Sequence, residues 1–500
     1  MLLNLLGCVL IFLLCLLYLK WTRVKSYWSK KNVPHAPPHL FLGSLTYLQK
    51  KNAGEWMKEQ YVKFKKAPYF GIWLFWRPAL VINSPDIARN ILVRDSDNFR
   101  NRFLSSGKTD PIGSLHLFTV NDPLWSTVRR KITTAFTSLK LKALQPMLIA
   151  KSNDLCKRIH KEIAQKEDVD IRDVFTDFST DVVGIGSFGI ECNSTLTGDG
   201  PMRRVTRGFQ EYSFFRGLGH LCIFFIPELV DIFRCTFFPK DATDYFSQVF
   251  RTVLKQRGGL EKPVEEVKDF VDSLIKLKQD EKDNELITMD VLTAQAAVFV
   301  QGGFETTATT LAFVIYELAY NPECQERLYQ EIRDIKEKLD GKEFTNESLD
   351  EAVYMKACIN EALRKFPPMG WLDRVAAKDY NIDENLTIPA GTPVYINGIA
   401  IQMDPDYFPE PDKFIPDRFL PENEKNIQPF TNFPFGEGPR MCIGRRFAYT
   451  ALKQALAALI LSFKLKPQPK MPEPNKCQME KNSLFLLPAQ KISIIFEPRV

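Results

Sequence analysis

The segment Phe435-Gly-Glu-Gly438-Pro-Arg440-Met-Cys442-Ile-Gly444 is the most informative stretch of this 500-residue chain. Three glycines surround one cysteine, and glycine lets a backbone approach a flat ligand closely and adopt conformations closed to other residues. The amide groups after Cys442 can point at its sulfur, and a helix beginning near Ile443 adds its positive end. Because a metal deprotonates a coordinating thiol, the segment suits a thiolate ligand. The alternative is a buried cysteine in a glycine-rich turn, the usual state of a free cysteine.

Two pairs of residues lie at helical spacing. Glu361 and Arg364 are three apart in a predicted helix, and Trp125 and Arg129 are four apart in another, so each pair shares one face. Taken alone, a Glu-x-x-Arg pair arises by chance in a chain of this charge content. An ordinary amphipathic helix start would likewise explain Trp125 and Arg129.

The segment Gly302-Gly303-Phe304-Glu305-Thr306-Thr307 lies inside a long apolar helical pattern from Ala294 to Leu318. Two glycines within a helix each cost about 1 kcal/mol relative to alanine, which indicates a close approach of a ligand or an opened hydrogen-bond ladder. The Thr306 hydroxyl can bond back to the Gly302 carbonyl. The alternative is a glycine pair for helix packing, with solvated polar neighbours.

Taken together, these segments resemble the cytochrome P-450 (haem-thiolate monooxygenase) superfamily. The cysteine segment matches its haem-binding signature, Phe-x-x-Gly-x-Arg-x-Cys-x-Gly, at every fixed position, and the other motifs follow the family's order. The sequences of the cysteine segment and of Gly302-Gly-Phe-Glu-Thr are similar to those of insect microsomal family-six enzymes and of vertebrate family-three enzymes. Departures are small, such as Gly302 where alanine is commoner and Asp417 in place of glutamate.

The resemblance implies a role for each motif. Cys442 would be the axial ligand of the iron in haem b, in a loop with Phe435, Gly438 and Gly444, and its sulfur would push electron density toward O–O cleavage. Glu305 and Thr306 would relay protons, with Gly302 and Gly303 beside the haem. Glu361, Arg364 and Arg418 would form a structural triad. The haem propionates would be held by Trp125, Arg129, Arg374 and Arg440, and the substrate by Phe118, Phe299, Met369, Trp371 and Phe485.

The periodicity predicts one mainly α body with a small β-rich region. The resemblance implies that this body has the cytochrome P-450 fold. Short strands are expected within 69–82 and 392–399. Helices are expected over residues 125–148, 173–188, 294–318, 322–339 and 349–365.

The N-terminus predicts one transmembrane helix that is retained as an anchor. No charged residue occurs from Leu2 to Leu19, and a helix of ~18 residues reaches about 27 Å, the thickness of a bilayer core. The alternative is a cleaved signal peptide, but the positive charges follow the apolar run and no Ala-x-Ala site appears. We therefore expect an anchor over residues 1–19, a basic, proline-rich hinge over 20–43 and a catalytic domain over 44–500. The expected location is the endoplasmic reticulum membrane, with the domain facing the cytosol.

A second apolar segment, Leu221 to Phe238, is interrupted by Pro227 and by charged residues, so it is not a membrane span. It is expected to be either core or an exposed loop that dips into the membrane.

Several classes of protein are excluded or disfavoured. The charge of 66 basic and 60 acidic residues, or +6, is spread along the chain and does not suggest nucleic acid. Ten cysteines without a Cys-x-x-Cys pair fit a reducing compartment, without a zinc site. The run Gly184-Ile-Gly186-Ser-Phe-Gly189 fits a dinucleotide fingerprint but follows a helical pattern, so helix packing explains it better. Electrons would therefore come from a separate protein.

The expected reaction inserts one oxygen atom of O₂ into a small lipophilic substrate. NADPH–cytochrome P-450 reductase would supply the electrons, with cytochrome b5 as an optional second donor. The docking face would be formed by Arg130, Lys131, Lys140, Arg445 and Arg446, unless these are ordinary surface charges. One alternative is a haem-thiolate isomerase or dehydratase, against which Glu305 and Thr306 argue. A non-catalytic carrier of haem or ligand is the other, and for it Thr306→Ala would change nothing.

Overall fold

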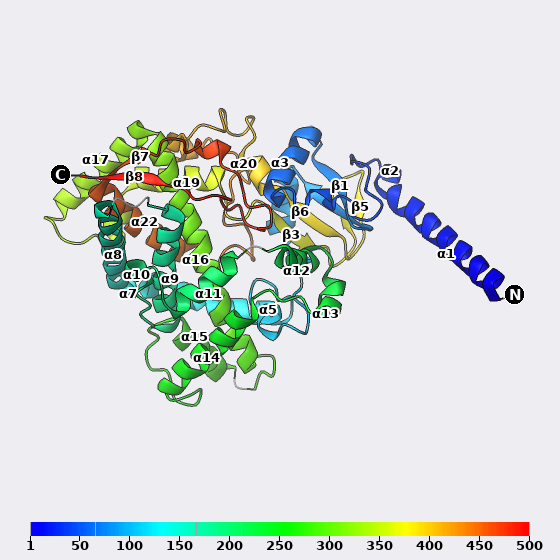
Figure 1. The fold of residues 1–500 in the computed structure, drawn as a ribbon, viewed down its shortest axis with the longest axis horizontal. Coiled ribbons are helices and arrows are strands. Elements are labelled where there is room, and N and C mark those ends of the chain that lie inside the picture. Colours follow the sequence, from blue (N-terminus) through cyan, green and yellow to red (C-terminus); the bar gives the residue numbers. More distant parts are fainter. Residues whose placement is uncertain (1, 66, 166–168, 212, 282, 500) are drawn as a thin grey trace.

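A small sheet and a much larger helical body lie side by side, as the periodicity predicts (Figure 1). The computed structural model describes residues 2–65, 67–165, 169–211, 213–281 and 283–499. A mainly helical body with one long buried central helix and a small sheet matches the expected fold class.

The main sheet has the strand order β1-β2-β6-β3, with β1 (Tyr69–Leu74), β2 (Arg77–Ile82), β6 (Pro393–Ile396) and β3 (Leu372–Val375). β2 pairs with β6 in parallel, and the other two pairings are antiparallel. The register sets Arg374 opposite Val394, which carries this arginine to the edge of the sheet next to the helical body. Two-stranded sheets are formed by β4 (Tyr380–Asn381) with β5 (Thr387–Ile388) and by β7 (Phe463–Pro467) with β8 (Ile494–Pro498).

The helical body is built around α16 (Met289–Tyr320), a 32-residue helix of which most side chains are buried. Its apolar residues surround the whole helix rather than one stripe, which is typical of a central helix. The other long helices are α8 (Gln145–Ala164), α9 (Ile171–Phe188), α14 (Lys240–Gln256), α15 (Phe270–Asp280), α17 (Pro322–Lys338), α19 (Val353–Lys365) and α22 (Arg445–Ser462).

The remaining elements connect these helices. The α-helices among them are α2 (Tyr27–Lys30), α3 (Ala53–Phe64), α4 (Pro85–Arg89), α5 (Pro111–Leu115), α6 (Leu124–Ile132), α7 (Ser138–Ala143), α10 (Ser194–Thr197), α11 (Pro201–Gln210), α12 (Phe214–Phe225), α13 (Val230–Phe233), α18 (Asn346–Asp350), α20 (Gly398–Gln402) and α21 (Pro421–Glu424). The 3₁₀ and π turns are η1 (Leu45–Tyr47), η2 (Asn90–Arg94), η3 (Thr133–Phe136), η4 (Pro227–Leu229), η5 (Pro416–Phe419) and η6 (Pro474–Lys476).

Two predicted helices are wrong in their continuity. The helix expected over 125–148 is split into α6, η3, α7 and the start of α8, because Thr137 is extended and Pro146 lies in the first turn of a new helix. The helix expected over 349–365 is interrupted between α18 and α19. The helices predicted over 173–188, 294–318 and 322–339 are confirmed as α9, α16 and α17, and the strand segments as β1, β2 and β6.

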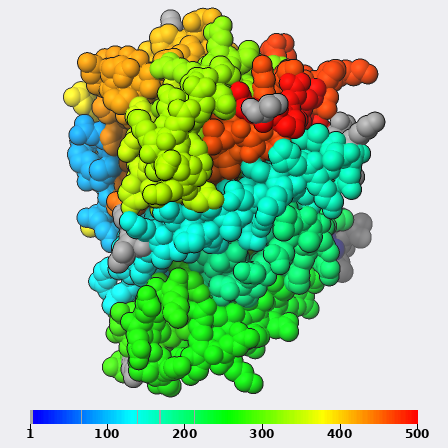
Figure 2. Space-filling view, turned by 90° about the vertical axis from the view of Figure 1, so that its left-hand side faces the viewer, coloured from blue at the N-terminus to red at the C-terminus, as the bar shows by residue number. Residues whose placement is uncertain are grey.

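Figure 2 shows the face turned away from the N-terminal helix. There, cyan and teal segments around α6 and α8 cross the molecule between the green α14–α15 region below and the yellow-green α17 and orange C-terminal segments above. The surface is thus assembled from parts of the chain far apart in sequence.

The first helix, α1 (Leu2–Lys25), projects from the body beside the sheet (Figure 1). The stretch Asn4–Lys25 is long and apolar enough to cross a membrane, and no residue of its most apolar window is buried in the rest of the protein. The buried α16 also passes this test of length and composition, but two thirds of its window is covered by protein.

The chain that follows α1 packs against β1. Trp28 is fully buried and its indole nitrogen donates to the Ile72 carbonyl at 3.0 Å. Its ring lies directly over Gly71, where a Cβ atom would overlap it. The Trp73 indole donates to the Val24 carbonyl at 3.0 Å. The predicted hinge is therefore fastened to β1 by two tryptophan contacts, at Gly71 and at Trp73.

Candidate active site

Glycines at positive φ shape the loop that carries Cys442. Gly436 and Gly438 have φ of 72° and 74°, a region that favours glycine. A Cβ atom on Gly438 would overlap the Leu92 carbonyl, so no other residue fits there. The loop closes where the Cys442 amide donates to the Phe435 carbonyl at 2.9 Å. The helix α22 then begins at Arg445, three residues beyond the cysteine.

The Cys442 side chain is exposed in the sense that it keeps accessible surface, and the surrounding protein still desolvates its thiol. Burial raises its pKa, and the amide groups of Gly444 and Arg445 with the cations of Arg129 and Arg445 oppose this rise. Because the amide groups point at the sulfur as the sequence predicts, the surroundings favour a thiolate over a neutral thiol once a metal withdraws charge.

Arg129 is tied to the same loop. Its Nη2 atom donates to the carbonyl of Met441, the residue before the cysteine, at 2.7 Å. Burial lowers the pKa of Arg129, and the charge of Cys442 opposes this. The structure therefore places Arg129 against the cysteine loop, beside the sulfur it would help to stabilise.

Three buried arginines gather on one side of this loop: Arg102, Arg374 and Arg440. Among the described residues only one buried carboxylate, that of Asp373, pairs with them, and it lies 2.9 Å from Arg102. Three cations less one anion leave an excess of two positive charges. An excess of this kind inside a protein requires anionic partners.

The electrostatics of these arginines point the same way. Burial, with repulsion from Arg102 and Arg374, lowers the pKa of Arg440 to about 8, and burial and Arg102 lower that of Arg374 to about 10. A guanidinium keeps its proton in proteins. The repulsion between these buried cations is therefore reduced by bound anions and not by loss of a proton. Moreover, Arg440 Nη1 and Arg102 Nε are buried without a hydrogen-bond partner in the part of the chain that the structure describes. The two carboxylates of haem b fit this cluster in charge and donor chemistry.

Trp125 completes this side of the site. It is buried, and the Arg440 guanidinium lies 4.2 Å from the centre of one of its rings. The structure thus brings Trp125, Arg374 and Arg440 together, as the family pattern implies. Arg102 is a member of the cluster that the sequence analysis missed. A lone arginine in a loop gives no signal until Asp373 and Arg440 are seen beside it.

The two glycines of α16 have different surroundings. A Cβ atom on Gly303 would lie 2.5 Å from Cγ1 of Val183, so this glycine lets α9 pack closely. At Gly302 no atom beyond the helix's own backbone and the two chain neighbours lies within 4 Å of such a Cβ. The Thr306 hydroxyl donates to the Gly302 carbonyl at 2.6 Å, as predicted. Gly302 and Thr306 both keep accessible surface on one face of an otherwise buried helix, as a helix beside a flat cofactor must.

The predicted triad is present as a geometric unit. Glu361 and Arg364 are fully buried and make two hydrogen bonds of 2.8 Å, and Arg418 Nε lies 3.4 Å from Glu361. The Ile415 amide also donates to Glu361 at 3.0 Å, and Arg364 donates to the Gln402 carbonyl at 2.9 Å. Every charge is therefore paired, which is the condition for burying such a group.

An aromatic cluster gathers some of the predicted substrate contacts. The Phe118 ring lies 6.3 Å from Phe224, which in turn lies 6.0 Å from Trp371. The Leu486 amide donates to the Pro368 carbonyl at 3.0 Å, which brings the segment of Phe485 beside that of Met369. The fold thus brings together three separate segments that carry predicted substrate contacts. The first holds Phe118, the second holds Met369 and Trp371, and the third holds Phe485.

Phe299 lies elsewhere. Its ring stacks on Phe270 at 4.6 Å and lies 5.3 Å from Phe136 and 5.7 Å from Phe447, in a depression of the surface shared with those rings. The structure does not bring it into the cluster of Phe118 and Trp371, and its contact with substrate stays a prediction.

The fold and the cysteine loop define a haem-thiolate protein, and comparison with known families agrees. The family model described as cytochrome P450 matches residues 33–496, so the chain belongs to the cytochrome P450 family. It is a P450 monooxygenase, and the family implies haem as its cofactor.

Similar proteins include insect enzymes of family six, which confirms that resemblance. Cytochrome P450 6k1 of Blattella germanica is 34% identical over 488 residues, covering 93% of this chain and 92% of the relative. Probable cytochrome P450 6g2 of Drosophila melanogaster is 34% identical over 458 residues, covering 87% and 88%. Cytochrome P450 6a2 of the same fly is 33% identical over 481 residues, covering 91% and 93%.

Proposed function

We propose that this chain is a membrane-anchored monooxygenase that inserts one oxygen atom of O₂ into a small lipophilic substrate. The candidate substrates are a xenobiotic, a plant terpenoid or allelochemical, an insecticide, or an endogenous lipid or hormone. The observation that carries the proposal is Cys442, held in its glycine loop beside three buried arginines with an excess of two charges.

The residues divide the work. Cys442 would bind the iron. The propionates would be held by Trp125, Arg129, Arg374 and Arg440, as the resemblance implies, and by Arg102. When bound, haem with a thiolate ligand supplies the activation of O₂. Glu305 and Thr306 would move protons along α16, and the aromatic cluster around Phe118 and Trp371 would bind the apolar substrate and exclude water.

The exposed apolar side chains support membrane association of the body as well as of α1. Within Leu221–Phe238 most apolar residues are buried, so the core alternative holds for most of that segment, and only Ile232 and Phe233 are largely exposed. The segment after η1 lies beside α12, since Gln49 is close to Gly217. The loop before η1 is tied to the β1–β2 turn, because Trp76 donates to the Leu40 carbonyl, and the next residue, Arg77, pairs with Glu228 just before α13. Together they present one patch with α13: Leu40, Phe41, Leu42, Phe214, Phe215, Leu218, Ile232 and Phe233. A patch of this kind is typical of a surface that enters a membrane.

We propose that α1 anchors the protein in the endoplasmic reticulum membrane and that the catalytic domain faces the cytosol. The basic residues after the apolar run support this orientation. Electrons would come from NADPH through NADPH–cytochrome P-450 reductase, with cytochrome b5 as an optional donor. Arg130, Arg445 and Arg446 are exposed and support an acidic partner at the face of the cysteine loop.

The decisive experiment is the difference spectrum of the reduced, carbon monoxide-bound protein. The wild type is expected to show the thiolate-ligated form, and Cys442→Ser is expected to lose it, whereas Cys8→Ser in α1 serves as a matched control. Iron ligated by imidazole, or protein without porphyrin, would overturn the proposal.

A second measurement separates the proposed reaction from isomerase, dehydratase and carrier functions. With reductase and NADPH, the wild type is expected to consume O₂ and form product, and Thr306→Ala is expected to divert O₂ to peroxide. Product formed from a peroxide substrate without NADPH would indicate an isomerase or dehydratase instead.

A further inference from the structure

Two cysteines from different elements lie in side-chain contact on one side of α12. Cys222 belongs to α12 and Cys235 follows α13, and their thiols are close enough for a hydrogen bond between them. Gly219 lies on the same face of α12 as Cys222, and a Cβ atom on Gly219 would be 4.0 Å from Cβ of Cys235. Both observations place Cys235 against this face of the helix.

The backbone around Cys235 turns the chain back toward α12. Arg234 has a φ of 50°, in the left-handed region, and it ends α13. The Cys235 amide then donates to the Val230 carbonyl at 2.9 Å. The two cysteines therefore stand at the two ends of a folded segment, 222–235, which holds η4 and α13.

Both ends of this segment are bound to the stretch 105–110, directly beside the cysteines. The Ser105 amide donates to the carbonyl of Ile223, the residue after Cys222, at 3.0 Å. At the other end, the Phe237 amide donates to the buried carboxylate of Asp110 at 2.6 Å. The contact between the thiols is thus maintained by main-chain hydrogen bonds on each side of it.

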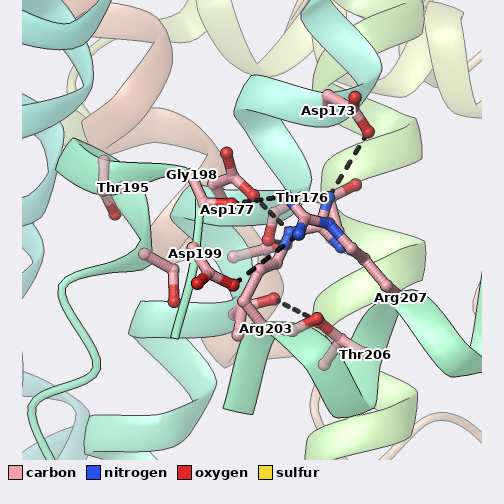
Figure 3. A network of polar contacts seen from close by, with 12 residues as sticks. Asp173, Thr176, Asp177, Thr195, Gly198, Asp199, Arg203, Thr206 and Arg207 are labelled. Atoms are coloured by element: carbon pink, nitrogen blue, oxygen red, sulfur yellow. Dashed lines mark hydrogen bonds and ion pairs between the residues drawn. The ribbon is translucent and has the colours of Figure 1, made fainter. Parts of the chain in front are cut away.

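The chain before α12 is fastened to the helical body. Figure 3 shows Arg203 of α11 between Asp173 and Asp177 of α9, and Arg203 forms ion pairs with both. The Arg203 side chain is fully buried, so this attachment is firm. A new link between the two cysteines would therefore act on the segment 222–235 and not on α11.

The two thiols differ in their access to solvent and in their acidity. Cys222 is buried, and burial together with the neighbouring Cys235 raises its pKa to about 11. Cys235 is only partly buried. Because oxidation of a cysteine follows its accessibility and thiolate character, Cys235 is the thiol that a peroxide reaches first. Cys222 is then the neighbour that can resolve the oxidised product.

We infer that Cys222 and Cys235 form a reversible disulfide when the protein meets a peroxide. Hydrogen peroxide first converts the Cys235 thiol into a sulfenic acid, as the O–O bond breaks and one water leaves. The Cys222 sulfur then attacks the sulfenic sulfur, so that an S–S bond forms, the S–O bond breaks and a second water leaves. In total the two thiols give up two electrons and two protons, and the peroxide becomes two waters. A dithiol reductant restores both thiols.

The disulfide would restrict a segment that lies against the aromatic cluster. Phe224 and Phe225, within the linked segment, have ring centres 6.0 and 6.2 Å from that of Trp371. A link between the ends of the segment removes conformations in which it moves away from Trp371. Oxidation is therefore expected to slow the entry of a lipophilic ligand. This consequence rests on the proposed substrate role of the aromatic cluster, whereas formation of the disulfide does not.

The test uses the full-length holoenzyme, which is oxidised with hydrogen peroxide, alkylated to block free thiols, and digested with trypsin without reduction. Trypsin cleaves after Arg234, so the two cysteines fall in separate peptides, 217–234 and 235–240. Mass spectrometry of the oxidised wild type is expected to show these peptides as one linked species, lighter than their sum by two hydrogen atoms. Treatment with dithiothreitol is expected to separate them.

Single substitutions identify the partners. Cys222→Ser and Cys235→Ser are each expected to lose the linked species, and Cys222→Ser is expected to leave Cys235 as a sulfenic acid that dimedone labels. Cys192→Ser is the matched control, because Cys192 is also partly buried but its thiol donates to the Ile190 carbonyl at 3.5 Å. This variant should form the link as the wild type does. If the oxidised wild type yields the two peptides only unlinked, the inference is wrong.

The second readout is the association rate of clotrimazole, a lipophilic imidazole, followed by the haem absorbance. Oxidation is expected to slow association in the wild type and in Cys192→Ser but not in Cys235→Ser, and dithiothreitol should restore the rate. An unchanged rate in fully linked protein would show that the disulfide does not control ligand entry. Failure of the proposed function is distinct, because the wild type would then lack the thiolate spectrum or NADPH-dependent product, whereas the linked peptides require neither.

Discussion

The carbonyl of Leu92 occupies the space that a side chain on Gly438 would need, so the cysteine loop is in backbone contact with η2. This contact joins the loop to a segment more than three hundred residues earlier in the chain. The loop is therefore shaped by a neighbour as well as by its own glycines.

Gly438→Ala is expected to destabilise the protein and to lower its haem content. The left-handed conformation alone costs a non-glycine residue about 1–2 kcal/mol, and the overlap with Leu92 adds to that. Thermal unfolding and the haem-to-protein ratio measure the effect. Gly208→Ala on α11 is the control, since no atom lies near its would-be Cβ and alanine favours a helix. Equal behaviour of the two variants would contradict the prediction.

Glu361→Gln is expected to lower stability by about 3–5 kcal/mol, because it leaves Arg364 and Arg418 without their buried anion. The matched change Asp417→Asn removes an exposed partner of Arg327 and is expected to cost less than about 1 kcal/mol. Calorimetric unfolding of both variants checks this. Near-equal losses would show that the triad is not what stabilises this region.

Arg102→Gln is expected to weaken haem retention, although the sequence motifs do not include Arg102. Its Nε atom is buried without a partner among the described residues, and its loss removes one of the two excess charges beside Arg440. Release of haem to an acceptor protein, followed by absorbance, measures the effect. Arg94→Gln, whose partner Asp95 is at the surface, should release haem at the wild-type rate. If Arg102→Gln releases haem at the wild-type rate, Arg102 does not belong to the haem site.

Stability is expected to fall as the pH drops below about 6.5, in part through His116. Burial lowers its pKa from 6.5 to about 3, so the unfolded chain takes up a proton in this range while the folded protein does not. The stability that neutral His116 contributes is therefore complete above 6.5 and is lost toward pH 3, at about 1.4 kcal/mol per pH unit. Burial also lowers the pKa of His220, to about 4, which acts in the same direction.

His116→Phe tests this because the ring lies among Phe118, Phe237 and Phe238, where another aromatic side chain fits. Unfolding curves from pH 4 to pH 7 are expected to show a shallower loss of stability than in the wild type. An unchanged slope would mean that other groups cause the acid sensitivity.

The sequence was sufficient for the fold class and for most of the site, because those features depend on local patterns. Glycines around Cys442, the helical spacing of Glu361 and Arg364, and the long apolar α16 are all visible in the chain. The continuity of the helix predicted over 125–148 was wrong, although Pro146 already indicated a new start.

Other features depend on tertiary contacts and could not be predicted. Arg102 matters only because Asp373 and Arg440 lie beside it, and Glu305 is held by Gln210 from another helix. Phe299 belongs to the right helix but stacks on Phe270, since the direction of a side chain depends on what packs against its helix. The spacing of residues along one helix or strand does not indicate which residues of other elements will contact it.

The tryptophan contacts of the N-terminal segment have a geometric consequence. Because Trp28 fills the space over Gly71 and Trp73 binds the Val24 carbonyl, the direction in which α1 leaves the body is inherited from the backbone of β1. A lipid-embedded α1 would then fix the tilt of the whole enzyme relative to the bilayer normal. Which faces of the protein a membrane-dissolved molecule or a neighbouring membrane protein can reach would follow from this one junction.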